Sequence, residues 1–359
     1  MKTIEGKKNV IGLLLAIVLL AAALLFYKDS LWDILQGIRA LSPGDVAVCS
    51  LLGILFYILE GTIITGITRQ LYPAYPWGAG VGTAFCCEFY RLITFGSGAG
   101  LAEIYYLSQK GVDPAQGTGI SMIQFILKKI SVMLWGVFGF VVLLALGEAE
   151  KIRTSYGSFM ILGCFITVLI VGVMMSVIVS DKMLRLMLWC LDRIAGKFSK
   201  WSEKAQNLKE KVTLFHTSGR MIFARKKVLF YLVGLNLVKF LTAYFIPTWI
   251  FMRQCGKFVP DSFSAGVTAG ILDGGLPPLE CILLMAVIYM LAGVIPAPSG
   301  IGSLEFVFLL FFGAYYTETV AVPAILVFRY ATWILPFVLG GVIALAQKRT
   351  HSPNTNKTP

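Results

Sequence analysis

Apolar residues dominate long stretches of this chain, and polar residues are confined mainly to the segments between them. A membrane-spanning helix needs roughly 20 predominantly apolar residues. The stretches that meet this requirement are 10–27, 46–68, 119–146, 157–180, 228–252 and 322–346. The pattern therefore predicts an all-α integral membrane protein, a polytopic helix bundle that crosses the bilayer several times.

Two further regions, 78–107 and 262–316, are apolar but interrupted. Each contains one copy of the pattern SGxGxxE, at 97–103 and at 299–305. Hydrocarbon cannot satisfy the backbone N–H and C=O groups that such a break frees, so broken segments occur where protein or a water-filled cavity surrounds them. Paired interruptions at corresponding places in two halves of a chain are typical of transporter binding sites.

Composition and charge support this class and set the topology. The chain is 57% hydrophobic and 14% charged, whereas a soluble domain carries roughly 25% charged residues. Residues 181–227 hold twelve Lys or Arg against four Asp or Glu. Because basic loops stay in the cytoplasm, this segment is predicted to be cytoplasmic, and basic residues near both ends of the chain place the termini on the same side.

Counting crossings between these fixed points predicts two hairpins. The span 46–68 ends on the cytoplasmic side, and the basic segment 181–227 lies on that same side. The spans 119–146 and 157–180 already supply the even number of crossings needed between them, so region 78–107 enters and returns from the cytoplasmic side. The same count makes region 262–316 enter and return from outside. The sequence thus predicts two inverted repeats, about 46–180 and 228–346, each with a re-entrant broken-helix hairpin. Two full spans in place of either hairpin would satisfy the same count.

We expect one transmembrane domain over 1–346, beginning with an uncleaved helix rather than a signal peptide, and a polar cytoplasmic tail over 347–359. Inside the basic segment, apolar residues recur at three- and four-residue spacing, which predicts an amphipathic helix. Such a helix lies on an anionic membrane surface or packs on the cytoplasmic face of the protein itself, and the sequence favours neither. Its apolar positions are Leu184, Met187, Leu188, Leu191, Ile194, Phe198 and Trp201.

Charges in the predicted membrane segments are candidate functional groups. Each costs about 2.5–3.5 kcal/mol at the centre of an unpaired helix, so these residues should pair or face water. Glu88 and Arg91 can meet on one helical face, as a structural salt bridge or as part of a site. Lys128 and Lys129 point about 100° apart, so at least one faces the interior unless both lie near the interface. Arg329 either binds phosphate bidentately or reaches the nearer surface. The full set is Glu60, Glu88, Arg91, Glu103, Lys128, Lys129, Lys239, Glu280, Glu305 and Arg329.

The SGxGxxE segments have two interpretations. Successive free N–H groups before a helix can form an anion-binding nest, which favours a charged headgroup at mid-membrane. Alternatively, Ser97 and Ser299 cap the helices that follow, with Glu103 and Glu305 in the first turns. Little else in the chain suggests chemistry, because neither His lies in an apolar segment, no CxxC spacing occurs, and there is neither a Walker A sequence nor a nucleophile elbow. We therefore expect no catalytic residue, metal or other cofactor, and no nucleic-acid partner.

Two motifs resemble one known family. The segment Ile295-Pro296-Ala297-Pro298-Ser299-Gly300-Ile301-Gly302-Ser303-Leu304-Glu305, together with Phe328-Arg329-Tyr330, resembles the lysylphosphatidylglycerol synthase transmembrane family, the flippase-like membrane domain of bacterial multiple-peptide-resistance proteins. Residues 95–103, followed by Ile-Tyr-Tyr-Leu, look like the other glycine-rich motif of that family. Serine stands at 97 and 299 where many relatives have glycine. Full-length relatives add a cytosolic aminoacyl-transferase domain, which has no counterpart here, so the resemblance implies lipid handling rather than aminoacylation.

The sequence therefore predicts translocation of a phospholipid or aminoacyl-phospholipid, such as lysyl-phosphatidylglycerol, from the inner to the outer leaflet. A secondary transporter of a small charged solute and a membrane-embedded lipid transferase remain alternatives. We expect a multi-pass protein of a bacterial or archaeal cell membrane; a separate lipid-modifying synthase and a homodimer are partners that the sequence leaves open. The expected substrate-binding residues are Arg91, Lys128, Lys129 and Arg329 for phosphate, Glu103 and Glu305 for a cationic group or as caps, and the loop residues Ser97, Gly98, Gly100, Ser299, Gly300 and Gly302.

Overall fold

A computed structural model describes residues 39, 41–94, 96, 98–146, 150–197, 202–256, 276–295, 297, 300 and 302–350. Every regular element in these ranges is a helix. The predicted first span, the C-terminal tail beyond residue 350 and the two motif serines, Ser97 and Ser299, lie outside the described residues.

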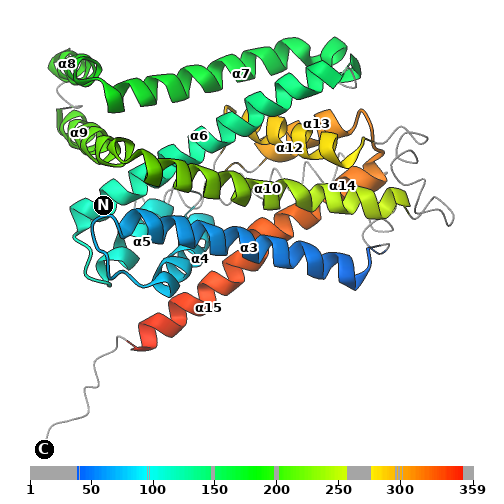
Figure 1. Cartoon of the computed structure of the whole chain (residues 1–359), viewed down its shortest axis with the longest axis horizontal. Coiled ribbons are helices and arrows are strands. Elements are labelled where there is room, and N and C mark those ends of the chain that lie inside the picture. The colour runs from blue at the N-terminus through cyan, green and yellow to red at the C-terminus, as the bar shows by residue number, and fades with distance from the viewer. Residues whose placement is uncertain are drawn as a thin grey trace, which may run out of the picture.

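Five long helical segments form the bundle (Figure 1). They are α3 (Pro43–Thr68), α6 (Pro114–Leu146), α7 (Glu150–Val179), α10 (Lys226–Gly256) and a composite of α14 (Glu318–Arg329), the π-helix η4 (Tyr330–Ile334) and α15 (Leu335–Thr350). Within the described ranges, all five are long and apolar enough to cross a membrane. Five of the predicted spans are therefore confirmed as helices of sufficient length and apolarity, although most of these helices begin several residues earlier than the apolar pattern indicated.

Two pairs of shorter helices fill the remaining space. The first pair is α4 (Trp77–Ile93) and α5 (Ala99–Ser108), and the second is α12 (Pro278–Ala292) and α13 (Ser303–Phe312). Each pair is interrupted at one copy of SGxGxxE, as predicted. In Figure 1, α4 and α5 lie in the half of the bundle near α8 and α9, whereas α12 and α13 lie in the other half.

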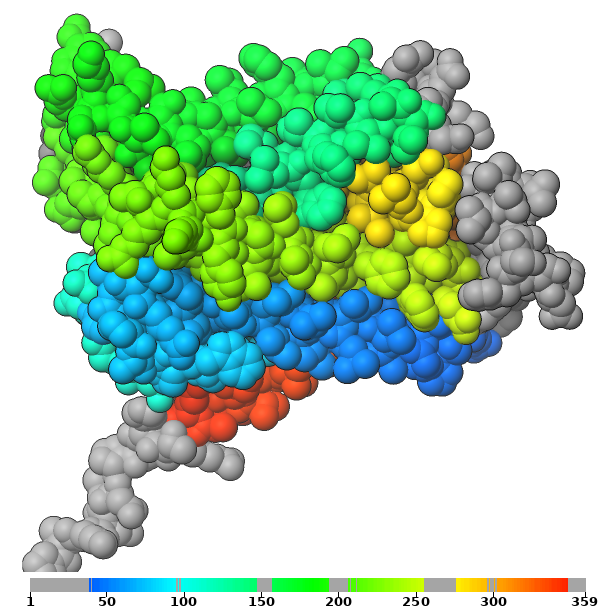
Figure 2. Space-filling model, viewed as in Figure 1, coloured from blue at the N-terminus to red at the C-terminus, as the bar shows by residue number. Residues whose placement is uncertain are grey.

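Glycines permit the closest helix contacts in this bundle. A Cβ atom at Gly61 of α3 would lie 2.3 Å from Cα of Val81 on α4, and one at Gly80 would lie 2.0 Å from Oγ1 of Thr65. Small residues at helix interfaces allow backbones to approach in this way within membranes. On the surface, Figure 2 shows α3 and α10 as adjacent bands along the bundle.

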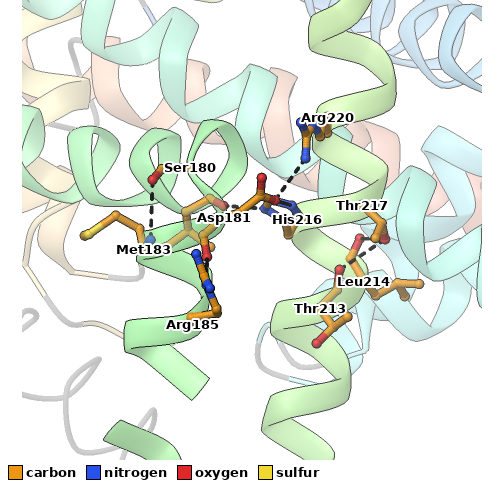
Figure 3. Close-up of polar contacts among 10 residues, drawn as sticks. Ser180, Asp181, Met183, Arg185, Thr213, Leu214, His216, Thr217 and Arg220 are labelled. Carbon is orange, nitrogen blue, oxygen red and sulfur yellow. Dashed lines mark hydrogen bonds and ion pairs between the residues drawn. The ribbon is translucent and has the colours of Figure 1, made fainter. Parts of the chain in front are cut away.

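Two polar helices, α8 (Asp181–Lys197) and α9 (Ser202–Ala224), lie together at one end of the bundle (Figure 1). Buried His216 of α9 joins them to α7, because its Nδ1 lies 2.7 Å from the carbonyl oxygen of Val177 and its Nε2 lies 3.1 Å from Oδ1 of Asp181. Arg220 donates to the same carboxylate at 2.9 Å (Figure 3). Asp181, the first residue of α8, is thus held by two side chains of α9.

The predicted amphipathic helix is confirmed as α8, although Phe198 and Trp201 lie outside the described residues. The helix contacts both α7 and α9, so part of its apolar face packs on the protein. It also exposes 51% of Leu186 and 55% of Trp189. One part of this helix therefore packs on the protein, and its exposed apolar side chains leave another part able to contact a membrane surface.

Candidate functional site

A cavity of about 300 Å³ lies between the helices at the point where both interrupted pairs approach α3 and α6. Its wall is formed mainly by α3, α4, α5 and α6 on one side and by α14 and η4 on the other. The predicted site residues that line it are Arg91, Gly100, Glu103, Lys128 and Arg329. The first and last of these residues, Arg91 and Arg329, are more than 200 positions apart in the sequence, and the fold brings them to the same cavity.

Arg329 binds the second glycine-rich loop rather than solvent. Its Nε donates to Oε1 of Glu305 at 2.6 Å, and its Nη2 donates to Oε2 of Glu305 at 2.7 Å and to the carbonyl oxygen of Gly300 at 2.9 Å. Glu305 also accepts the N–H of Gly302 at 2.9 Å, which is the helix-capping contact expected at the third residue of α13. Arg329 therefore points inward, and Glu305 acts as a cap and as its counter-ion.

The backbone of this loop requires glycine at two positions. Gly300 has φ of 72° and Gly302 has φ of 85°, a region that L residues with a Cβ atom rarely adopt. One of the two interpretations of the motif makes its serines the helix caps, but the residues at the cap positions of α5 and α13 are Gly98 and Gly302. The glycines of the motif thus shape the break, and glutamate supplies the cap in the second copy.

Trp333 is a contact of Arg329 that the sequence did not reveal. The guanidinium carbon of Arg329 lies 3.8 Å from the centroid of the indole, and that of Arg91 lies 5.7 Å from it, so one aromatic ring faces arginines from both halves of the chain. Trp333 lies in the π-helix η4, a type of element frequent at functional sites. In an α-helix the carbonyl oxygen of Thr332 would accept a hydrogen bond from the N–H of residue 336, but residue 336 is a proline and has no N–H. The hydroxyl of Tyr57 donates to that oxygen instead, at 2.9 Å.

The first glycine-rich segment is built differently. Helix α5 begins at Ala99, the third residue of its motif, whereas α13 begins at the fifth. Glu103 is consequently the fifth residue of its helix and lies beyond the reach of the cap position. Its side chain points instead to α6, where Oγ of Ser121 donates to Oε2 at 2.7 Å.

Arg91 forms the predicted contact with Glu88, at 2.6 Å between Nη2 and Oε1. Glu88 is only 4% exposed, so the pair neutralises a buried carboxylate on α4. Nε of Arg91 is buried and has no hydrogen-bond partner among the described residues. One donor of this cavity-lining guanidinium is thus buried and unsatisfied among the described residues.

A second buried ion pair joins Glu60 of α3, which lines the cavity, to Lys239 of α10. Nζ of Lys239 donates to Glu60 and, at 2.8 Å, to Asn236, and the lysine side chain is fully buried. Gln124 of α6 donates to the other carboxylate oxygen of Glu60 at 2.9 Å. Sequence reasoning identified Glu60 and Lys239 as intramembrane charges, but it missed Gln124.

The two adjacent lysines of α6 separate as the helical period requires. Lys128 lines the cavity, whereas Lys129 does not and lies with Nζ 5.7 Å from the ring centroid of Phe125. Ser121, Gln124 and Lys128 share one face of α6 because they are spaced by three and four residues. That polar stripe within an apolar helix is the signal that could have identified Ser121 and Gln124.

Pairing leaves two charges uncompensated around the cavity. Glu60, Glu88 and Glu305 each have a basic partner. Among the described lining residues, Glu103 and Lys128 make no ion pair within 4.0 Å. The cavity therefore offers one carboxylate and one ammonium group that form no direct ion pair, although the charge of Lys128 acts at longer range on both Glu60 and Glu103.

A family model described as the lysylphosphatidylglycerol synthase TM region matches residues 9–340. The chain belongs to this family. The lysylphosphatidylglycerol synthase TM region spans both interrupted helix pairs and the whole cavity, and membership makes the chain a multi-pass membrane protein related to the handling of lysyl-phosphatidylglycerol. No curated protein matches the chain.

Proposed function

We propose that this protein moves a phospholipid or aminoacyl-phospholipid, such as lysyl-phosphatidylglycerol, from the inner to the outer leaflet by taking its headgroup into the central cavity. The observation that carries the proposal is Lys128, an ammonium group that forms no ion pair within 4.0 Å among the described residues and lines a cavity inside a membrane bundle. Intramembrane charges that face a cavity typically mark a substrate pathway. A phosphate is the anion that every phospholipid headgroup would bring to this position.

The other basic residues fit supporting roles. Arg329 and Arg91 are already bound to Glu305 and Glu88, so they contribute positive potential and positioning. Lys129 does not line the cavity, so we assign it no contact with substrate. The first glycine-rich segment lines the cavity through Gly96 and Gly100, and the second is joined to it through the contact of Arg329 with Gly300.

Access from both leaflets follows from inverted hairpins. In this proposal, the α4–α5 pair enters from the cytoplasmic side, and the α12–α13 pair enters from the outer side. Their positions in opposite halves of the bundle support this arrangement (Figure 1). Rocking of one repeat against the other would then expose the cavity alternately, as inverted-repeat transporters do.

The test is leaflet exchange in liposomes that contain the purified protein. Phosphatidylglycerol and lysyl-phosphatidylglycerol are followed separately by the accessibility of their headgroups to reagents added outside. Lys128→Gln is expected to slow exchange by about tenfold or more, the effect of losing one hydrogen bond to a charged group. Lys129→Gln is the matched control, because it removes the same charge from the neighbouring position outside the cavity, and it should exchange lipid as the unmodified protein does.

Two results would overturn the proposal. If the folded protein exchanges neither lipid faster than empty liposomes, lipid translocation is wrong and a small charged solute becomes the substrate to test. If both lysine variants behave alike, lipid movement does not use the cavity.

A further inference from the structure

The two copies of SGxGxxE place their glutamates in different environments. Glu305 has a bidentate arginine and a backbone N–H. Glu103 has neither, because α5 starts two motif positions earlier and moves its carboxylate out of the cap position. Identical sequence patterns therefore give one neutralised structural glutamate and one glutamate without a cation.

Glu103 is buried beside the cavity with incomplete hydrogen bonding. The residue is 6% exposed, Oε2 accepts only from Ser121, and Oε1 has no partner among the described residues. A carboxylate buried without a cation is costly, and this cost is removed when it binds a proton. The serine hydroxyl suits both states, because it can donate to a carboxylate and accept from a carboxylic acid.

The surrounding charges do not substitute for a direct partner. Glu60 on α3 is held by Lys239 of α10, Arg91 on α4 by Glu88, and Arg329 on α14 by Glu305. Cys87 of α4 and Tyr289 of α12 also line the cavity. Lys128 of α6 is the remaining cation among the described lining residues; it forms no ion pair with Glu103 within 4.0 Å, and the attraction between their charges is opposed by the repulsion from Glu60.

We propose that Glu103 binds an exchangeable proton and that lipid and proton move together. The proposal rests on the proposed function, because the phosphate on Lys128 supplies the second charge. A bound phosphate and an ionised Glu103 repel each other inside a low-dielectric cavity, so each bound phosphate favours a proton on Glu103. The O–H bond forms with a proton from the side where lipid enters and breaks toward the side where lipid leaves, and nothing is oxidised or reduced.

This coupling makes a proton gradient an energy source. One phosphatidylglycerol anion and one proton carry no net charge across the membrane together. A gradient of one pH unit can therefore sustain up to about a tenfold difference of this lipid between leaflets, independently of membrane potential.

The experiment uses liposomes of phosphatidylcholine with trace labelled phosphatidylglycerol, with the membrane potential clamped by a potassium ionophore. The unmodified protein should accumulate the label in the leaflet on the alkaline side and should distribute it evenly without a gradient. Glu103→Gln should abolish gradient-driven accumulation and make the exchange rate independent of pH. Glu318→Gln, on the exposed first turn of α14 outside the cavity, is the matched control and should accumulate label as the unmodified protein does.

A second variant protects the test against misfolding. Ser121→Ala removes the one hydrogen-bond donor that Glu103 has among the described residues, and it should shift the pH midpoint of exchange upward while gradient-driven accumulation persists. Exchange that ignores the gradient in the unmodified protein overturns proton coupling and leaves lipid translocation standing, whereas absence of any exchange overturns translocation itself. Gradient-driven accumulation that survives in folded Glu103→Gln also overturns the assignment of Glu103.

Discussion

Arg329 and Glu305 form a two-point contact across the cavity wall, with Nε on one carboxylate oxygen at 2.6 Å and Nη2 on the other at 2.7 Å. The arginine is 11% exposed and the glutamate 33% exposed. The same guanidinium binds the carbonyl of Gly300 in the glycine-rich loop. The pair thus fixes the break between α12 and α13 to the α14–η4 junction.

Loss of this contact should cost stability as well as transport. Arg329→Gln and Glu305→Gln are each expected to lower the free energy of unfolding by about 1.5–3 kcal/mol, the range for hydrogen bonds to charged groups. Because each single change already breaks the same contact, the double variant should lose less than the sum of the two. SDS titration of the protein in mixed micelles measures all three values, and strictly additive losses would show that the two residues are not coupled.

The contact between Lys239 and Glu60 predicts a larger effect. Lys239 is fully buried with its ammonium between a carboxylate and an amide, so Lys239→Met leaves Glu60 without its cation. Removal of one partner of a buried pair costs about 3–5 kcal/mol. Thermal unfolding in detergent should show this loss, and addition of Glu60→Gln to the same variant should recover part of it.

The control for this pair is Lys129→Met. It removes a lysine from the same membrane region where no ion pair is lost, so its unfolding temperature should remain near that of the unmodified protein. If Lys239→Met is equally stable, the buried pair does not contribute as the geometry indicates.

Glycine packing between α3 and α4 gives a sharply matched comparison. A methyl group at Gly80 would lie 2.6 Å from the carbonyl oxygen of Gly61 and closer still to Thr65, whereas nothing lies within 4 Å of one at Gly78. Gly80→Ala should therefore destabilise the protein by about 1–3 kcal/mol through overpacking. Gly78→Ala, two residues away on the same helix, should change stability by no more than about 0.5 kcal/mol, and equal effects in the two variants would contradict the close approach of α3 and α4.

The sequence was sufficient for features that depend on local patterns. Apolar length predicted the five described spans, glycine spacing predicted both interruptions, and i,i+3 spacing predicted the contact between Glu88 and Arg91. The separation of Lys128 from Lys129 followed from helical geometry alone. Each of these features depends on residues that are near one another in the chain.

Features that depend on contacts between distant segments were not accessible in the same way. The pairing of Glu60 with Lys239 joins residues 179 positions apart, and neither local sequence indicates its partner. The shared SGxGxxE pattern predicts equivalent roles for its two copies, yet their helices begin at different positions and give the glutamates different contacts. The stacking of Arg329 on Trp333 depends on a π-helix, which apolar periodicity does not reveal.

The orientation of the hairpins can be tested through chemical labelling of single cysteines. Cys190 is exposed on α8, and it should react with a membrane-impermeant maleimide only from the cytoplasmic side once the other cysteines are replaced. Gly78 lies at the start of α4 and Lys110 just after the end of α5, and both are exposed. Cysteines placed at these two positions should react from that same cytoplasmic side if this helix pair is re-entrant. A cysteine at exposed Ala314, just after α13, should react from the opposite side. Labelling of positions 78 and 110 from opposite sides would replace the first hairpin by a full crossing, and it would remove the inverted arrangement that the proposed mechanism requires.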